Sequence, residues 1–343
     1  MVYATYTGKA AEVLRKKGNK NAMTLHRLLY NSIPKQGGGF FRKPKLYLGY
    51  SIIVVDECSM VPKSMIDMLL KHRVFVIFLG DPCQLPMIDK NENHDLLEHP
   101  HIFLDEIMRQ AAESEIIQLT MKIRNGENIP YMQGKEVIIA PREELVTGHL
   151  IWADAVLCST NATRHVLNNQ IRELLGFDKD ILLNENEKIL IKRNYWENCN
   201  EDGDALVNGT IGTVKNSFDS FIMLPKRIKN DRHKIPTIMA DFLPEGGKSF
   251  GTINFDKDFL INEEPCVDWR VAYQVNRMRK TIGDILPRHA TYGYALTAWV
   301  AEGSEWDNVV VIEEAFPFNK EEHRKFLYTS ATRASKKLVL IKN

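Results

Sequence analysis

The sequence lacks the features of a membrane, secreted or zinc-binding protein. No run of eighteen apolar residues is present, which excludes an ordinary transmembrane helix. The N-terminus has no positively charged segment followed by an apolar one, so it does not resemble a secretory signal. The five cysteines are scattered and form no C-x-x-C pair, which argues against a disulfide framework or a zinc site. We therefore expect reduced thiols in a cytoplasmic protein.

Internal repeats and low-complexity tracts are also absent. The 343 residues are 44% hydrophobic and 26% charged, as in an ordinary globular protein. A chain of this length is expected to form two or three domains.

The net charge of +1 conceals an uneven distribution of charge. Residues 1–50 contain ten Lys or Arg and a single acid, Glu12. Such clustered cations are typical of a phosphate-binding face, as on a nucleic-acid-binding protein, and equally of a solvated helix surface. The charge pattern alone leaves both interpretations open.

Short apolar runs that end in small or acidic residues recur along the chain. They cover residues 51–55, 74–79, 155–158, 309–312 and 338–341. Continuous runs of this length predict strands buried on both faces, as in a parallel sheet flanked by helices. Helical patterns fall between them, at 9–17, 62–71, 113–123 and 163–175. The alternation predicts an α/β fold with ligands at the carboxyl ends of the strands.

The pattern changes between about residues 185 and 288, where strand-like pieces are separated by Gly, Asn and Asp turns. This predicts a small β-rich domain inserted into the second α/β unit. The Gly- and Pro-containing segment 31–49 predicts an exposed hairpin or loop.

Asp56 and Glu57 follow the first of the buried strands. At such a position Asp56 could hold Mg²⁺ through water, and Glu57 could orient and deprotonate the water that attacks a nucleoside triphosphate. The alternative is that the pair simply caps the strand end.

Three further side chains suit a triphosphate. Gln84 follows the next strand and offers an amide that can sense a γ-phosphate or its water. Arg109 and Arg333 carry guanidinium groups, which pair with phosphate oxygens in two places and keep their charge. Arg333 could act as an arginine finger that stabilises charge on the transferred phosphoryl group. The alternative for either arginine is an ordinary surface ion pair.

Five motifs in order resemble superfamily 1 helicases of the RecD/Dda type, which include the exodeoxyribonuclease V alpha subunit and its phage relatives. The motifs are Asp-Glu-Cys-Ser-Met (56–60), Gly-Asp-Pro-Cys-Gln-Leu-Pro (80–86), Met-Arg-Gln (108–110), Glu-Gly-Ser-Glu-Trp (302–306) and Tyr-Thr-Ser-Ala-Thr-Arg-Ala (328–334). The resemblance spans essentially the whole chain. It implies ATP and Mg²⁺ as cofactors, with Gly303 and Glu305 also in the nucleotide site, and a bacterial or phage-infected cell as the setting.

The resemblance also implies a domain plan. Residues 1–125 would form a first RecA-like P-loop NTPase domain with a strand-splitting hairpin at 31–49, and residues 126–185 would lead into the second. Residues 186–288 would form an SH3-like insertion, since Leu206–Gly212 resembles that domain, and residues 289–343 would complete the second RecA-like domain.

The DNA-binding residues follow from the same resemblance. The expected partners are single-stranded DNA and junctions between duplex and single strand. The residues that match the family's DNA-contacting segments, the hairpin and the start of the second motor domain are Thr7, Gly8, Lys9, Thr24, His26, Phe40, Phe41, Asn161, Arg164 and Thr297.

The sequence departs from the family at the phosphate loop, G-x-x-x-x-G-K-S/T, which is expected a few tens of residues before Thr7. Gly8-Lys9-Ala10 lacks the hydroxyl, and Gly247-Lys248-Ser249 has Phe242 at the first glycine position, so we interpret the latter as a turn. We expect an N-terminally truncated chain, with an incomplete first sheet and little unaided ATP turnover, or a separate polypeptide that supplies the loop.

A second departure precedes Gly303, where Val300 and Glu302 replace the family's usual lysine and glutamine. The loss of a cation and the gain of an anion are expected to weaken a phosphate contact, unless Val300 simply packs. The expected function is ATP-dependent 5′-to-3′ translocation on single-stranded DNA with strand separation. The alternative is a single-stranded DNA-binding fragment or accessory subunit without its own turnover.

Overall fold

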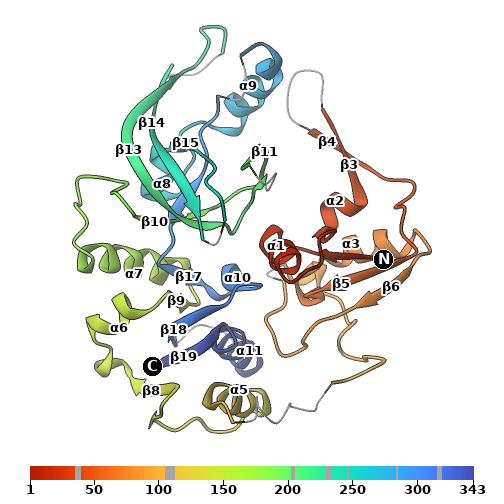
Figure 1. Cartoon of the computed structure of the whole chain (residues 1–343), viewed down its shortest axis with the longest axis vertical. Helices are drawn as coiled ribbons and strands as arrows, with labels where there is room; N and C mark the ends of the chain where they lie inside the picture. The colour runs from red at the N-terminus through yellow and green to blue at the C-terminus, as the bar shows by residue number, and fades with distance from the viewer. Residues whose placement is uncertain are drawn as a thin grey trace. The chain divides into compact units, whose positions relative to one another are not determined.

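The computed structural model describes residues 1–34, 40–87, 89–104, 113–201, 205–228, 233–245, 247–282, 285–314 and 319–343. The chain divides into two compact units (Figure 1). The first unit comprises Met1–Leu28, Tyr47–Leu175 and Tyr294–Asn343, and the second comprises Leu29–Leu46 and Gly176–Gly293.

The first unit contains two sheets, one parallel throughout and one parallel except for its last strand, as the alternation of apolar runs and helices predicted. The N-terminal sheet has the strand order β2-β1-β5-β6 and is parallel throughout. Its strands are β1 (Val2–Thr5), β2 (Met23–Thr24), β5 (Ile52–Asp56) and β6 (Phe75–Phe78). The helices between them are α1 (Gly8–Lys16), α2 (Leu25–Leu29, which ends at the unit boundary) and α3 (Lys63–Leu70). A short 3-10 turn, η1 (Cys58–Met60), follows β5.

The second sheet of this unit has six strands in the order β17-β9-β18-β19-β8-β7. They are β17 (Ala295–Thr297), β9 (Ala155–Cys158), β18 (Trp306–Ile312), β19 (Ala334–Lys342), β8 (Val137–Pro141) and β7 (Met132–Gln133), of which only β7 is antiparallel. The helices around it are α5 (Glu115–Asn125), α6 (Thr147–Trp152), α7 (Asn161–Leu174), α10 (Ala298–Ala301) and α11 (Lys320–Ala331). Helices α6 and α7 pack on one face and α5 and α11 on the other (Figure 1). The strands are therefore buried on both faces, which explains their continuous apolar runs.

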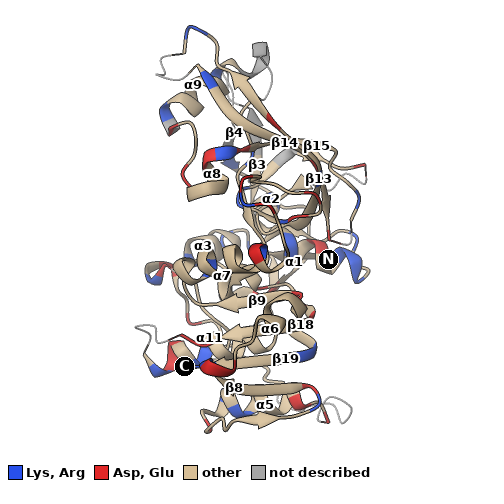
Figure 2. Ribbon diagram, turned by 90° about the vertical axis from the view of Figure 1, so that its left-hand side faces the viewer, with Lys and Arg blue, Asp and Glu red and all other residues tan. Residues whose placement is uncertain are grey.

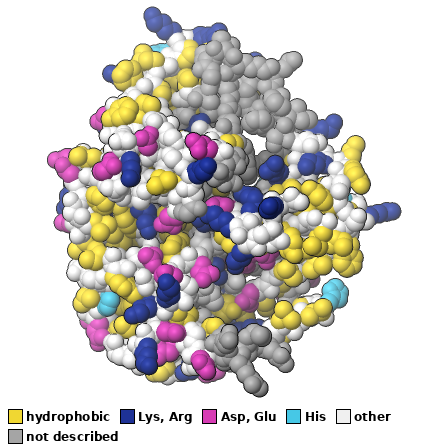
Figure 3. All heavy atoms as spheres, viewed as in Figure 1, with side chains coloured by type: hydrophobic (Ala, Val, Ile, Leu, Met, Phe, Trp, Pro, Cys, Tyr) yellow, Lys and Arg dark blue, Asp and Glu magenta, His cyan; other side chains and the backbone are white. Residues whose placement is uncertain are grey.

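Strand β6 differs from the prediction that its run is buried on both faces. Phe75 is 65% exposed, and Ile77 and Leu79 are also exposed. Among the described residues β6 pairs only with β5, so it lies at a sheet edge. Figure 3 shows hydrophobic side chains on the right of the view, the side on which Figure 1 draws β6. The exposed residues alternate along the chain, so they share one face, and that face is uncovered among the described residues. The prediction was wrong here because an apolar run does not reveal whether both faces of a strand are covered.

The second unit is built on an antiparallel sheet of five strands in the order β15-β14-β13-β10-β16. They are β15 (Thr252–Asp256), β14 (Lys234–Pro244), β13 (Ile211–Met223), β10 (Lys188–Ile191) and β16 (Ala290–Tyr292). The pairs β11 (Tyr195–Cys199) with β12 (Ala205–Leu206) and β3 (Tyr30–Pro34) with β4 (Phe40–Pro44) form two small antiparallel ladders, the latter within the predicted hairpin segment. Gly247-Lys248-Ser249 lies in the connection between β14 and β15, where a turn was predicted.

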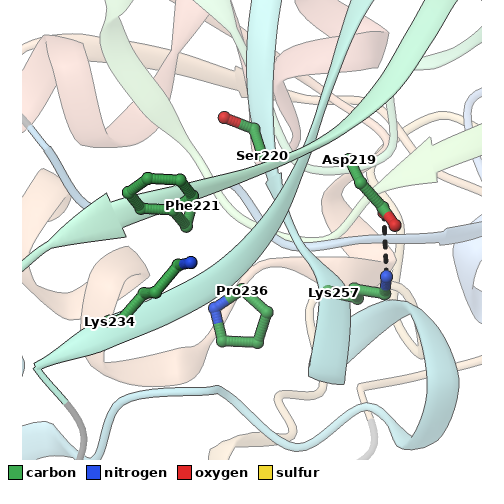
Figure 4. A pocket seen from close by; sticks show the side chains of 6 residues that line it. All are labelled: Asp219, Ser220, Phe221, Lys234, Pro236 and Lys257. Carbon is green, nitrogen blue, oxygen red and sulfur yellow. Dashed lines mark hydrogen bonds and ion pairs between the residues drawn. The ribbon is translucent and has the colours of Figure 1, made fainter.

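Two helices complete this unit, α8 (Lys257–Asn262) and α9 (Trp269–Ile282). One apolar cluster joins Ile222 and Ile235 of the sheet to Val271 and Val275 of α9. Elsewhere on β13 and β14 an open pocket of about 350 Å³ is lined by Asp219, Ser220, Phe221, Lys234, Pro236 and Lys257 (Figure 4). Within it the Lys257 ammonium lies 2.8 Å from the Asp219 carboxylate, and the Lys234 ammonium lies 4.1 Å from the centre of the Phe221 ring.

Charges are spread over both units, with acidic and basic positions interleaved along the ribbons (Figure 2). In α1, the Lys16 ammonium pairs with Glu12 at 2.8 Å, and the Arg15 guanidinium donates to the Ala22 carbonyl at 3.1 Å. Part of the cation excess of residues 1–50 therefore has a structural role, whereas Lys17 and Lys20 are exposed. In the part of the chain that is described, no helix has the length and apolar character needed to span a bilayer.

Candidate nucleotide and DNA sites

The acidic pair follows β5 as the sequence predicted, and its backbone is turned sharply there. Asp56 ends β5 beside Thr5 of β1. Glu57 has φ 52°, in the left-handed region, and its amide donates to the Asp56 carboxylate at 3.0 Å. A left-handed residue with a side chain costs roughly 1–2 kcal/mol, so it persists only where its surroundings hold it. This turn directs the chain away from the strand axis immediately after the two carboxylates.

The environment of Glu57 favours its protonated form. Burial raises the pKa of Glu57, the Arg333 guanidinium lowers it, and the Asp56 and Asp81 carboxylates raise it further. The net result is a pKa above the ordinary value of 4.5. A carboxylate in such a site is a better proton acceptor than one in water.

The loop after β6 is packed against the turn after β5. The Cys58 amide donates to the Leu79 carbonyl at 2.9 Å. A Cβ at Gly80 would lie 2.8 Å from the Cys58 sulfur, so only glycine fits without a shift. The Asp81 carboxylate accepts from the Cys83 amide at 2.9 Å, and this closes a turn that carries Gln84.

Three hydrogen bonds join this loop to the second sheet's helices. The Tyr328 hydroxyl of α11 donates to Asp81 at 2.6 Å, and the Thr329 hydroxyl accepts from the Leu85 amide at 2.9 Å. The Trp299 indole of α10 donates to the Pro86 carbonyl at 3.2 Å. The motif after β6 thus contacts the last C-terminal motif, 328–334, and the helix that precedes the motif 302–306.

Arg333 is buried, with 7% of its surface exposed, at the end of α11. Its guanidinium donates to the Thr329 carbonyl at 3.1 Å, the Ser304 carbonyl at 3.3 Å and the Thr332 hydroxyl at 3.0 Å. The alternative of a surface ion pair is therefore wrong for Arg333. Its side chain is fixed in place, and its charge acts on Glu57.

Several buried polar atoms in the same motifs have no hydrogen-bond partner. They are the Ser59 Oγ, Gln84 Oε1, Glu302 Oε1 and Ser330 Oγ atoms. Buried polar atoms are rarely left unpaired in proteins, and each costs free energy unless a water or ligand satisfies it. Four further atoms of this kind lie in the second unit, at His233, Thr237, Asn254 and His289, and those in the motif segments are open to a polar ligand.

The carboxylate of Asp56 fits a magnesium site. Mg²⁺ in nucleotide sites takes one or two protein carboxylates and completes its shell with phosphate oxygens and water. No group of three or more metal-ligating side chains occurs in the described ranges, so a cage made only of protein ligands is not present there. Asp56 can supply the protein carboxylate that such a shared site needs.

Three other residues were predicted for the nucleotide site, namely Gly303, Glu305 and Arg109. Gly303 has φ 71°, and a Cβ there would lie 3.2 Å from the Ala10 Cβ, so α1 approaches it closely. Glu305 is exposed at the start of β18. Arg109 lies outside the described residues.

The predicted DNA contacts near the N-terminus lie at the ends of β1 and β2. Thr7 caps α1, and its hydroxyl accepts from the Ala10 amide at 3.2 Å, while Gly8 and Lys9 form the first turn. Thr24 is buried, and the His26 ring lies 5.9 Å from the Tyr6 ring. For Phe40 and Phe41 the structure describes only the backbone of β4.

The predicted DNA contacts in the second sheet are less accessible. Arg164 is 1% exposed, and its guanidinium donates to the Asn161 side-chain carbonyl at 3.1 Å. Thr297 is also buried. A direct contact of Arg164 with DNA would need its side chain to move, whereas Asn161 is exposed.

Sequence reasoning missed an internal anion beside these residues. The Glu314 carboxylate accepts from the amides of Ser159 and Thr160, from both of their hydroxyls and from the Thr163 hydroxyl. Burial by itself raises the pKa of Glu314, but the hydrogen bonds outweigh it and the pKa is lowered. The available signal was an acidic residue shortly after the apolar run 309–312, the same pattern that revealed Glu57.

Two sequence families match the chain. The AAA domain matches residues 1–138, and the UvrD-like helicase C-terminal domain matches residues 292–341. An uncharacterised protein of Acanthamoeba polyphaga mimivirus is 23% identical over 98% of this chain and 88% of its own length. The ATP-dependent RecD2 DNA helicase of Deinococcus radiodurans is 28% identical over 96% of this chain, which spans 41% of that helicase.

Solved structures of similar fold include two helicases. The Pif1 helicase from Bacteroides, in complex with ADP-AlF3 and single-stranded DNA, matches with a TM-score of 0.51 and 15% identity over 99% of this chain and 82% of its own. The Pif1 helicase from Candida albicans matches with a TM-score of 0.50 and 15% identity, over 99% and 90%. These likenesses agree with the expected pair of RecA-like domains. By these two sequence families and the RecD2 relative, the chain is similar to superfamily 1 helicases of the RecD type, and its fold is similar to that of the Pif1 helicases.

Proposed function

We propose that this protein is an ATP-dependent DNA helicase that moves 5′-to-3′ along single-stranded DNA and separates duplex strands. The observation that carries the proposal is that Arg333, which follows α11 beside the second sheet, acts electrostatically on Glu57, which follows β5 of the first. Its charge lowers the pKa of that carboxyl against the effect of burial, and Tyr328 and Thr329 of α11 are hydrogen-bonded to the loop after β6. A catalytic carboxylate and an arginine from two sheets are the parts that nucleoside triphosphate hydrolysis needs.

Each residue has a distinct role in the proposed reaction. Glu57 accepts a proton from the water that attacks the γ-phosphorus, while the bond to the ADP oxygen breaks. Gln84 accepts a hydrogen bond from that water through its buried and unpaired Oε1 atom. Arg333 stabilises the charge that develops on the phosphoryl oxygens. Asp56 would hold Mg²⁺, which supplies charge neutralisation at the phosphates.

The remaining predicted residues complete the proposal. Arg109, Gly303 and Glu305 belong to the nucleotide site by resemblance to the family. The proposed DNA contacts are Thr7, Gly8, Lys9, Thr24, His26, Phe40, Phe41, Asn161, Arg164 and Thr297. The hydrogen bonds from Tyr328 and Thr329 to the loop after β6 offer a route by which ATP hydrolysis at one sheet moves DNA contacts on the other.

Steady-state ATP hydrolysis, measured with and without oligo-dT, tests the proposal. Turnover that oligo-dT stimulates and that Glu57→Gln abolishes would support it. Glu98→Gln makes the same chemical change at an exposed site and is expected to keep full turnover. Normal turnover in Glu57→Gln would remove Glu57 from its role. Turnover that begins only when a second polypeptide carrying a phosphate loop is added would assign the enzyme to two chains.

A second candidate function is single-stranded DNA binding without turnover. It is favoured by the ten cations and single acid of residues 1–50, of which Lys17 and Lys20 are exposed. Neutralised phosphates release counterions, so affinity falls with salt in proportion to the number of phosphate contacts. Substitution of both Lys17 and Lys20 by Glu should weaken oligo-dT binding and flatten its salt dependence. The same substitutions at the exposed Lys71 and Lys337 are the control and should change neither. If the dependence of oligo-dT affinity on salt is unchanged, these two lysines do not contact DNA.

A further inference from the structure

Glu302 is held in a confined position between α10 and β18. It follows the four-residue helix α10, and the next residue, Gly303, is so close to α1 that a Cβ there would lie 3.2 Å from the Ala10 Cβ. Only 7% of the Glu302 surface is exposed. The side chain therefore has little freedom to reach solvent.

The Glu302 carboxyl group is also incompletely paired. Its Oε1 atom is buried and has no hydrogen-bond partner. The charged groups that act on it are Arg333, at the end of α11, and Glu57, after β5. The Arg333 guanidinium already donates hydrogen bonds to Ser304, Thr329 and Thr332. Its positive charge is therefore not devoted to the Glu302 carboxyl group alone.

These conditions favour the uncharged form of the group. An ionised carboxylate that is buried without a complete set of hydrogen bonds is strongly disfavoured, and such a group usually takes up a proton instead. Glu57, a second carboxyl group nearby, increases this cost. Gln84, Ser59 and Ser330, in the other motif segments, also carry buried oxygens without hydrogen-bond partners.

We propose that Glu302 faces the nucleotide as an uncharged carboxylic acid, whose hydroxyl donates a hydrogen bond to a terminal phosphate oxygen. The proposal rests on the nucleotide site proposed above. In this form Glu302 adds a donor to the site and no negative charge. The anion expected from the sequence to weaken phosphate binding would then be absent at neutral pH.

The electrostatics of the site agree with this assignment. Burial raises the pKa of Glu302 well above its ordinary value of 4.5, Arg333 lowers it, and Glu57 raises it. Because the folded pKa lies above the unfolded one, the folded chain holds the extra proton. The stability of the native protein relative to Glu302→Gln must therefore fall as pH rises from the unfolded pKa to the folded one, and then level off.

Thermal unfolding from about pH 5.5 to about pH 9 tests the protonation state without nucleotide. The native chain, Glu302→Gln and the exposed control Glu98→Gln are compared at each pH. We expect the midpoint of Glu302→Gln to rise relative to the native chain as pH rises, while Glu98→Gln keeps a constant offset. A constant offset for Glu302→Gln would mean that Glu302 is ionised throughout, and would overturn the proposal.

Binding of a fluorescent non-hydrolysable ATP analogue with Mg²⁺ tests the phosphate contact. Loss of a hydrogen bond to a charged group corresponds to about tenfold in affinity, so the native chain should bind about tenfold more weakly at high pH than at low pH. Glu302→Gln keeps a donor and should bind with nearly the same affinity at both. Equal pH dependence in the two proteins would overturn the contact. No binding by either protein would overturn the nucleotide site itself, while the unfolding experiment would still decide whether Glu302 is protonated.

Discussion

The hydroxyl of Tyr328 donates a hydrogen bond of 2.6 Å to the carboxylate of Asp81, and so joins α11 to the loop that follows β6. Tyr328 is buried, and its bond lies beside the one from the Leu85 amide to the Thr329 hydroxyl. Consecutive residues of α11 thus bind the same loop. If one sheet moves relative to the other, either both hydrogen bonds break or the loop after β6 moves together with α11.

Tyr328→Phe tests this connection, because it removes the hydroxyl and keeps the ring. We expect a loss of about 1.5–3 kcal/mol in the free energy of unfolding, the usual range for a hydrogen bond to a charged group. Urea denaturation measures it. Tyr273→Phe, at an exposed tyrosine, is the control and should change little. An equal loss in both variants would show that the bond to Asp81 is not responsible.

Arg333→Ala separates the two roles of that arginine. The loss of an arginine finger is expected to reduce ATP hydrolysis by about three orders of magnitude. The variant also loses donors to three buried or part-buried oxygens, so it should unfold at a lower urea concentration. Assays below the unfolding transition, with oligo-dT binding as a readout of folding, distinguish the effects. A parallel loss of DNA binding and hydrolysis would point to a purely structural role.

Glu314→Gln tests the anion at the start of α7. Hydrogen bonds from Ser159, Thr160 and Thr163 lower the pKa of Glu314 below the ordinary value of 4.5 despite its burial. A group with a depressed folded pKa stabilises the protein above its unfolded pKa, and this stabilisation is lost as pH falls through the folded pKa. The native chain should therefore exceed Glu314→Gln in stability at pH 7, with a difference that shrinks below about pH 4.5. Denaturation at several pH values measures it, and a difference that persists in acid would contradict the assignment.

Local signals in the sequence were sufficient for much of the first unit. The runs 51–55 and 155–158 became β5 and β9, and the helical pattern 163–175 became α7. Strands with helices on both faces must be apolar at every position, so they are recognisable without knowledge of their neighbours. Glu57 and Gln84 were recognisable for the same reason, because each follows such a run.

Pairings between distant segments had no such signal. Glu314 was missed because its partners, Ser159, Thr160 and Thr163, lie about 150 residues away in the chain. The exposure of Phe75 was missed because the cover over that face of β6 depends on segments distant in the chain. The sequence showed that Glu302 replaces the glutamine usual in the family, but it did not show that the side chain is buried.

The sequence by itself determined several strands and helices, such as β5, β9 and α7, and the order of the motifs, since these depend on the pattern of consecutive residues. The tertiary structure alone decided which motifs meet. It decided that Arg333 acts on Glu57, that Tyr328 binds Asp81, and that Glu302 is enclosed. The physical reason is that the charge state and pairing of a side chain depend on the groups packed around it, and folding brings those groups together from distant parts of the chain.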